Sequence, residues 1–238
     1  MIRTITYNGV DFYKAFGFIV DTVTKQPPSK KENRQSVPYK SGTYNMYSNL
    51  GYSLFEDREL VYTGQLILDD STDLDRLLTK INSIVMSPSG DKVLQDNFNS
   101  EYHYLLEGQS VALADNERGY GELTITFKGY PFKIWNKGIH DVKWDEINFE
   151  LDEFQPDTFS AVQGKTFTVN NTSPEFVPFK YTASADFDVT IDGNAYHFSK
   201  GTYTAGYKLK PGKNVFNVVN ANSVSSITVS FDWYRREL

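Results

Sequence analysis

The side chains of this sequence that could do chemistry are few and lie far apart. His103, His140 and His197 fall in different segments, and none has the spacing that puts two metal ligands on one helix or hairpin. Cysteine is absent, which removes thiolate catalysis, disulfides and cysteine-ligated metals. We therefore expect no metal and no cofactor.

Two acidic clusters are the next candidates for a site. They consist of Asp69, Asp70, Asp73 and Asp75, and of Glu150, Asp152, Glu153 and Asp157. The first lacks the central glycine and the terminal glutamate of a calcium loop, and acids in the first turn of a helix explain it better. The second could supply the carboxylate pair of a glycoside hydrolase, but nothing fixes two carboxylates at a catalytic separation. A charged linker is the favoured interpretation. Nucleophile elbows, phosphate loops and dinucleotide fingerprints are also missing, so we do not expect an enzyme.

Aromatic residues make up 15% of the chain and suggest contact surfaces instead. Tyrosines crowd one stretch, and such rings often anchor subunit interfaces. This set comprises Tyr39, Tyr44, Tyr47, Tyr52 and Tyr62. The three tryptophans, Trp135, Trp144 and Trp233, could form a platform on which a sugar stacks. Strand alternation places Trp233 on the same face as Phe231, which predicts that it points inward.

Net charge and the length of the apolar runs argue against two classes of partner, nucleic acids and membranes. The net charge is −6 and both halves are acidic, so the basic footprint of a nucleic-acid-binding protein is missing. The longest apolar runs, such as Phe16–Val20, are far shorter than a membrane span. Residues 1–20 lack the apolar core of a secretory leader. We expect a soluble protein, made in a cytoplasm, that binds neither nucleic acid nor membrane.

The elements that would position these residues are nearly all strands. One amphipathic helix is predicted near 72–85, where six apolar residues recur at a helical period. They are Leu74, Leu77, Leu78, Ile81, Ile84 and Val85. Thr72 is the predicted N-cap. Asn8-Gly9 predicts a tight hairpin, Ser87–Leu94 is interpreted as a turn, and Glu122–Lys128 alternates like a half-buried strand.

The proline-containing stretch 25–43 has no periodicity, and two interpretations stay open for it. It is either a solvated loop or an ordered arm that grips a neighbouring subunit. From about residue 134 short strands recur with turns between them, a pattern typical of a jelly-roll β-sandwich. The fold class is therefore mainly β with one helix. The expected domains are 1–133, which carries the helix, and 134–238.

The order of these parts resembles the siphophage distal tail proteins (the Dit family). The resemblance depends on the Tyr7–Val10 turn, the helix at Asp73–Val85, the SPSGDKVL segment and Gly121–Phe132. In the second half it depends on Asn170-Asn171-Thr172 before Val177-Pro178, on Ile191-Asp192-Gly193, and on the closing PGKNVFNV and ITVSFDWYRREL segments. It implies an N-terminal ring-forming β-domain followed by a galectin-like β-sandwich.

The resemblance further implies a structural component of the virion at the distal end of a phage tail. A homohexameric ring would form the hub and join the tail tube to the tail-associated lysin or fibre. Implied partners are the major tail tube protein, the tape measure protein, and a baseplate or receptor-binding protein. A carbohydrate-binding β-sandwich protein used in host adsorption is the alternative, and it requires an exposed aromatic platform.

Overall fold

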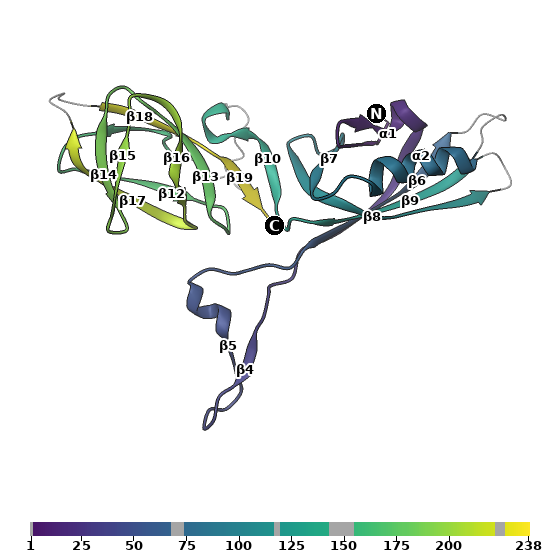
Figure 1. The fold of residues 1–238 in the computed structure, drawn as a ribbon, viewed down its shortest axis with the longest axis horizontal. Helices are drawn as coiled ribbons and strands as arrows, with labels where there is room; N and C mark the ends of the chain where they lie inside the picture. The colour runs from purple at the N-terminus through teal and green to yellow at the C-terminus, as the bar shows by residue number, and fades with distance from the viewer. Residues whose placement is uncertain (1, 68–73, 117–119, 143–154, 222–226) are drawn as a thin grey trace. The chain divides into compact units, whose positions relative to one another are not determined.

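The computed structural model describes residues 2–67, 74–116, 120–142, 155–221 and 227–238 (Figure 1). Strands dominate, which confirms the mainly β fold class. The chain divides into two compact units, Met1–Ile134 with Leu238, and Trp135–Glu237. Among the helices of the described residues, none has the length and apolar composition that a membrane crossing requires.

The first unit is built on a curled antiparallel sheet with the order β2-β1-β7-β8-β9-β6-β3. The strands are β1 (Ile5–Tyr7), β2 (Val10–Asp11), β3 (Phe18–Gln26), β6 (Arg58–Ile67), β7 (Lys92–Asp96), β8 (Tyr102–Asn116) and β9 (Tyr120–Gly129). The Val20 amide of β3 donates to the Arg3 carbonyl just before β1, at 2.9 Å. The sheet therefore curls until β3 lies beside the chain that leads into β1.

The predicted helix is present as α2 (Leu74–Met86), and the predicted N-cap Thr72 lies outside the described residues. Ile81 and Val85 are fully buried, whereas Leu77 and Leu78 are only half-buried. The helix packs against β8. Its apolar stripe thus joins the core that the sheet encloses, as its period predicts.

The prediction of a single helix is wrong, because a short helix α1 (Phe12–Phe16) precedes β3. The Asp11 carboxylate caps it by accepting from the amides of Tyr13 and Lys14, at 3.0 and 3.1 Å. Gly17 ends it in the left-handed conformation, with φ of 68°, a common helix stop. Five residues are too few for a helical period to show in the sequence.

Of two predicted turns near these elements, one is confirmed and the other is partly wrong. Asn8 and Gly9 both have positive φ, and Tyr7 pairs with Val10 across them, so the predicted hairpin is confirmed. The interpretation of Ser87–Leu94 as a turn is wrong from Lys92 onward, where β7 begins. The turn itself is limited to the residues around Gly90, which has φ of 73°.

The second unit is a sandwich of two four-stranded antiparallel sheets. The strands are β11 (Thr158–Ala161), β12 (Thr166–Asn171), β13 (Val177–Ala183), β14 (Phe187–Ile191), β15 (Asn194–Phe198), β16 (Gly201–Leu209), β17 (Gly212–Ala221) and β18 (Ile227–Asp232). Their orders are β11-β18-β13-β16 and β12-β17-β14-β15. Eight strands divided between two sheets in this way form a jelly roll, which confirms the predicted sandwich type.

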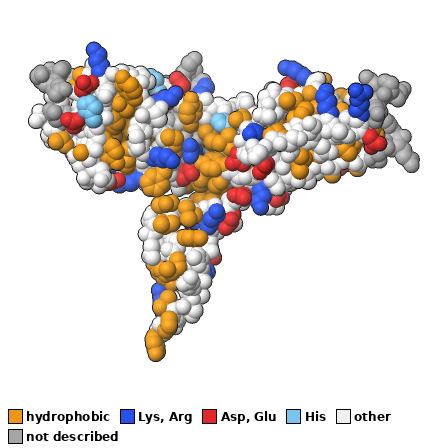
Figure 2. Space-filling view, viewed as in Figure 1, with side chains coloured by type: hydrophobic (Ala, Val, Ile, Leu, Met, Phe, Trp, Pro, Cys, Tyr) orange, Lys and Arg blue, Asp and Glu red, His pale blue; other side chains and the backbone are white. Residues whose placement is uncertain are grey.

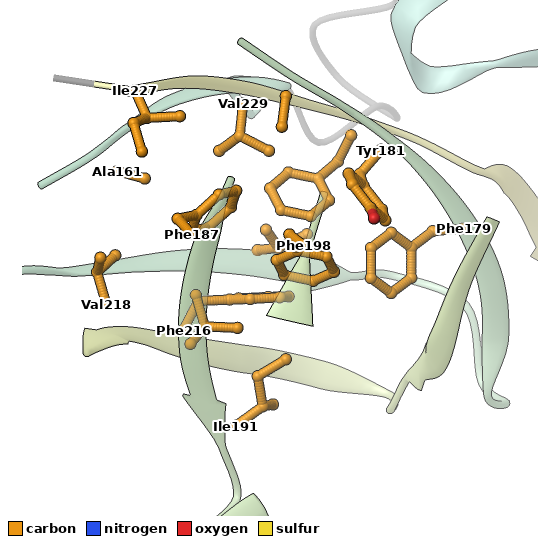
Figure 3. Close-up of a cluster of buried hydrophobic side chains, with 14 of the residues drawn as sticks. Ala161, Phe179, Tyr181, Phe187, Ile191, Phe198, Phe216, Val218, Ile227 and Val229 are labelled. Atoms are coloured by element: carbon orange, nitrogen blue, oxygen red, sulfur yellow. The ribbon is translucent and has the colours of Figure 1, made fainter. Parts of the chain in front are cut away.

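Aromatic rings fill the space between the two sheets (Figure 3). The Phe216 ring stacks on Phe167 at 5.0 Å between centroids and lies 5.2 Å from Phe231. Phe179 lies 5.3 Å from the same Phe231 ring. Contacts of this kind add to the burial of large apolar surfaces and give the unit a core of its own.

β10 (Lys133–Gly138) runs across the boundary between the units. It pairs with β19 (Tyr234–Glu237), and the Ile139 amide donates to the Trp233 carbonyl at 3.0 Å. The first strand of the second unit is thus hydrogen-bonded to its last strand.

Candidate assembly surface

Residues 27–57, named here the arm, form a two-stranded ribbon that leaves the sheet after β3 and returns at β6 (Figure 1). β4 (Arg34–Ser36) pairs with β5 (Thr43–Asn45), and Lys30 bridges to Phe55. Further backbone bonds join the amide of Lys31 to the carbonyl of Leu54 and the amide of Glu56 to that of Ser29, both at 2.8 Å. The stretch without periodicity is therefore part of a hydrogen-bonded element.

The arm contributes no buried side chain to either core. Several of its large apolar residues face solvent, as the orange stripe in Figure 2 shows. Val37, Met46 and Leu50 are exposed to between 41 and 45%, and Tyr39 is fully exposed. Apolar surface gathered on a projecting element is typical of a contact site for another protein.

Tyr39 also has an unusual backbone conformation. Its φ is 64°, a left-handed value that costs an aromatic residue about 1 kcal/mol or more. The turn is closed by the Lys40 amide, which donates to the Val37 carbonyl at 3.2 Å. The tip of the arm thus presents a large ring in a strained position, and none of the described residues covers it.

The other tyrosines of the arm are half-buried against its own polar residues. Tyr44 donates to the Asn49 side chain, and the Lys40 ammonium lies 4.9 Å from the Tyr44 ring centroid. Tyr47 and Tyr52 line a pocket of about 170 Å³. Its walls are otherwise largely polar, and it is smaller than a typical small-molecule site. These rings stiffen the arm and leave their outer edges at its surface.

The arm is basic on an acidic protein. Residues 27–54 carry four bases and one acid, whereas the whole chain carries 24 bases and 30 acids. The charged residues of this segment are Lys30, Lys31, Arg34, Lys40 and Glu32. With Glu56 and Asp57 at its end, the whole arm has a charge of +1 and the rest of the chain −7. The positive charge gathers in residues 30–40, which favours contact between this part of the arm in one copy and the body of another.

Tyr62 does not lie on this surface, so the prediction that it belongs to the contact face is wrong. It is fully buried in the sheet of the first unit, and its hydroxyl donates to Asp96 Oδ2 at 3.1 Å. Burial and the nearby Asp96 carboxylate raise the pKa of Tyr62 well above 10.0. Alternation along β6, with Leu60 also buried, is the signal that could have placed Tyr62 inside.

The sequence did not predict the polar cluster around Asp96. The Lys25 ammonium lies 2.8 Å from Asp96 Oδ2 and 3.4 Å from the Tyr104 hydroxyl. Asp96 is buried, and so is Arg58. Burial and the Asp96 charge raise the pKa of Tyr104 to about 12. Lys25 and Arg58 stand on the two sides of the arm, so this cluster lies at its root.

The predicted sugar platform is not assembled. Trp233 is buried in the core of the second unit beside strand β18, as its alternation with Phe231 predicts. The half-buried Trp135 has one ring face covered by the Arg235 guanidinium at 4.2 Å, and its indole donates to Glu237 at 2.8 Å. Trp144 lies outside the described residues. The two described tryptophans therefore form no shared platform, because Trp233 is buried and Trp135 has one ring face occupied.

The candidate catalytic and metal-binding groups lie in separate places. His140 contacts the Asp157 carboxylate, and His197 Nδ1 lies 2.7 Å from Asp188 Oδ1, while His103 is half-buried on β8. Asp75 is exposed in the first turn of α2. The remaining acids of both clusters lie outside the described residues. Within the described ranges, no group of three metal-ligating side chains occurs.

This chain is similar to known proteins in its fold and not in its sequence, and the similarity covers the whole chain. No family model matches the sequence, and no curated protein matches it either. Among solved structures, the SPP1 Dit protein matches with a TM-score of 0.63 and 16% identity, covering 100% of both chains. This chain has the Dit fold. The resemblance to distal tail proteins is thus confirmed for the fold.

A second solved structure, of the phage p2 baseplate in its activated conformation with Sr, also matches. It has 9% identity and a TM-score of 0.43, and the match covers 100% of this chain and 99% of the other. This likeness is too weak to carry an argument. The SPP1 Dit protein itself has been described as a paradigm of the hub adsorption apparatus in phages that infect Gram-positive bacteria.

Proposed function

We propose that this protein is a structural component of a phage tail tip, in which six copies form a ring that serves as the hub. The arm carries this proposal, because it is an ordered ribbon with no buried side chain and with exposed apolar residues. Such an element adds nothing to its own core and gains its stabilisation from another chain. The full-length likeness to the Dit fold supports the same role.

A ring requires a head-to-tail contact, in which one surface of a copy meets a different surface of the next copy. The basic segment 30–40 of the arm and the acidic remainder of the chain form such a pair of unlike surfaces. We assign Tyr39, Tyr44, Tyr47 and Tyr52 to the arm side of this contact. Tyr39 is the anchor, since its ring is fully exposed and rings at the centre of interfaces supply much of the binding energy.

The ring would lie at the distal end of the tail, in the virion, after synthesis in the host cytoplasm. On one side it would join the major tail tube protein and the tape measure protein, and on the other the tail-associated lysin or fibre. The jelly roll, galectin-like in this proposal, would dock a baseplate or receptor-binding protein. The role is structural and not enzymatic. Sugar binding is not retained as a second candidate, because Trp233 is buried and Trp135 is partly covered.

Light scattering on the purified chain tests the ring. A closed hexamer has a mass about six times the 27.2 kDa of the chain. Replacing residues 28–55 by a short glycine-rich turn between Pro27 and Glu56 removes the arm and leaves β3 and β6 intact. The expected result is a smaller species with unchanged thermal unfolding. A wild-type chain that stays monomeric at high concentration would contradict the hexamer, and an unchanged assembly without the arm would contradict the contact assigned to it.

A further inference from the structure

The arm meets the sheet at two strands only, and both carry a cation that points into one cluster. Lys25 is the next-to-last residue of β3, and Arg58 is the first residue of β6. Between them the chain runs through the whole arm without burying a side chain. The direction of the arm therefore depends on what holds these two positions.

On the β3 side the contact is a largely buried ion pair. The Asp96 side chain has no exposed surface, and its Oδ2 accepts from both Lys25 Nζ and the Tyr62 hydroxyl, at 2.8 and 3.1 Å. The Lys25 ammonium also lies between 5.4 and 6.0 Å from the ring centroids of Phe98, Tyr102 and Tyr104. An ammonium held by a carboxylate and faced by aromatic rings loses most of its freedom to move.

On the β6 side the contact is to the backbone and to the same tyrosine. Arg58 Nε donates to the Pro131 carbonyl at 2.7 Å, and the guanidinium lies 5.6 Å from the Tyr104 ring centroid. Burial lowers the pKa of Arg58. Two atoms of the cluster, Arg58 Nη2 and Asp96 Oδ1, are buried without a hydrogen-bond partner. Buried polar atoms without a hydrogen-bond partner lower the stability of the fold. Stability of the core alone therefore does not explain why these charged residues lie here.

We propose that the Lys25–Asp96 pair, with Arg58 on the opposite strand, is a positioning site that fixes the direction of the arm. This inference rests on the proposed contact between the arm and a neighbouring copy. It adds that the arm already has the direction needed for this contact in the free chain. A long exposed ribbon that moved freely would lose conformational freedom on each docking event. Fixing its root in the free chain reduces that loss.

The direction of the arm can be measured without reference to assembly. The chain has no cysteine, so Tyr39→Cys at the tip and Glu122→Cys on β9 would be the only sites for spin labels. Labelled chain diluted into an excess of unlabelled chain gives the distance within one copy by pulsed electron resonance. The expected result is a single narrow distance distribution. Lys25→Met and Asp96→Asn should each lose that narrow distribution, whereas Lys25→Arg should keep it.

Two control variants separate positioning from general destabilisation. Lys14→Met removes the partner of Asp11 in an exposed ion pair of the same unit, and Leu94→Ala weakens the core from β7, the strand that carries Asp96. Both should keep the narrow distribution at temperatures where circular dichroism shows a folded chain. The Asp96→Asn side chain can still accept from Tyr62, which favours folding of that variant.

Each outcome decides one of the two proposals. A broad distribution in the parent chain would overturn the positioning role, and so would a narrow one in both Lys25→Met and Asp96→Asn. Broadening in Leu94→Ala as well would also overturn it, because any loss of stability would then free the arm. The mass of unlabelled wild-type chain is a separate measurement. A monomer with a narrow distance distribution would contradict the proposed ring and still support the positioning role of the cluster.

Discussion

Gly108 of β8 lies directly against Val85 of helix α2. A Cβ placed on Gly108 would fall 2.3 Å from the Val85 carbonyl oxygen, and a backbone atom cannot move aside as a flexible side chain can. The helix can therefore approach the sheet this closely only because position 108 has no side chain. The contact holds α2, with its buried Ile81 and Val85, over the core of the first unit.

Gly108→Ala should destabilise the first unit by about 1–3 kcal/mol, the usual cost of forcing extra volume into a packed site. Urea unfolding monitored by circular dichroism measures it. The matched control is Gly206→Ala on β16, where an added Cβ meets nothing within 4 Å and φ is not positive. Equal stability of the two variants would contradict the close contact between α2 and β8.

Ile81→Ala should cost about 2–5 kcal/mol, the range for removing a fully buried aliphatic side chain. Leu78→Ala should cost clearly less, because Leu78 is only half-buried on the same helix. Denaturant titration of both variants gives the comparison. A larger loss for Leu78→Ala would mean that the helix packs through a different face.

Tyr39→Ala should weaken assembly without affecting folding. The ring is fully exposed, so its removal should change the free energy of unfolding by less than about 0.5 kcal/mol. Light scattering over a dilution series should show dissociation at a higher protein concentration than for the wild type. Tyr203→Ala, which removes an exposed ring of the jelly roll, should leave the assembly unchanged. A reversed pattern would move the contact from the arm to the second unit.

His140 should make the second unit more stable in mild acid than at alkaline pH. The hydrogen bond to Asp157, with the charges of Asp157, Asp232 and Asp141, raises the pKa of His140 above 6.5. A group whose pKa is raised by folding stabilises the folded state fully below its unfolded pKa. That contribution is lost as pH rises through the folded pKa.

His140→Gln is the variant that measures this effect. The stability difference between wild type and His140→Gln should be largest below the unfolded pKa of about 6.5 and disappear at higher pH. Thermal unfolding of both chains across this range provides the comparison. His197→Gln, which alters the separate contact with Asp188, serves as a control. A difference that does not vary with pH would exclude the linkage.

The elements that the sequence predicts well are those whose pattern is local. Leu123, Ile125 and Phe127 of β9 are all buried while the residues between them are not, as their alternation indicates. One face of such a strand must be apolar because it meets a core.

Elements whose pattern depends on distant partners were missed. β7 has only Val93 and Leu94 as apolar residues and ends in Asp96, which is buried because Lys25, far away in the sequence, supplies a counter-charge. A charged residue at an inward position breaks the alternation that identifies strands. Tyr62 has a different explanation, because the alternation of β6 already places it on the buried face with Leu60 and only its position near the arm's tyrosines suggested a contact surface.

The pairing of β10 with β19 has a consequence for how such a protein can change over time. A domain whose first and last strands are hydrogen-bonded to each other has its two ends at one place. It can then be exchanged for a different domain, or gain an insertion, without altering the order of strands in the first unit. In evolutionary terms the jelly roll is a replaceable domain, and the first unit can conserve its own contacts while this domain changes.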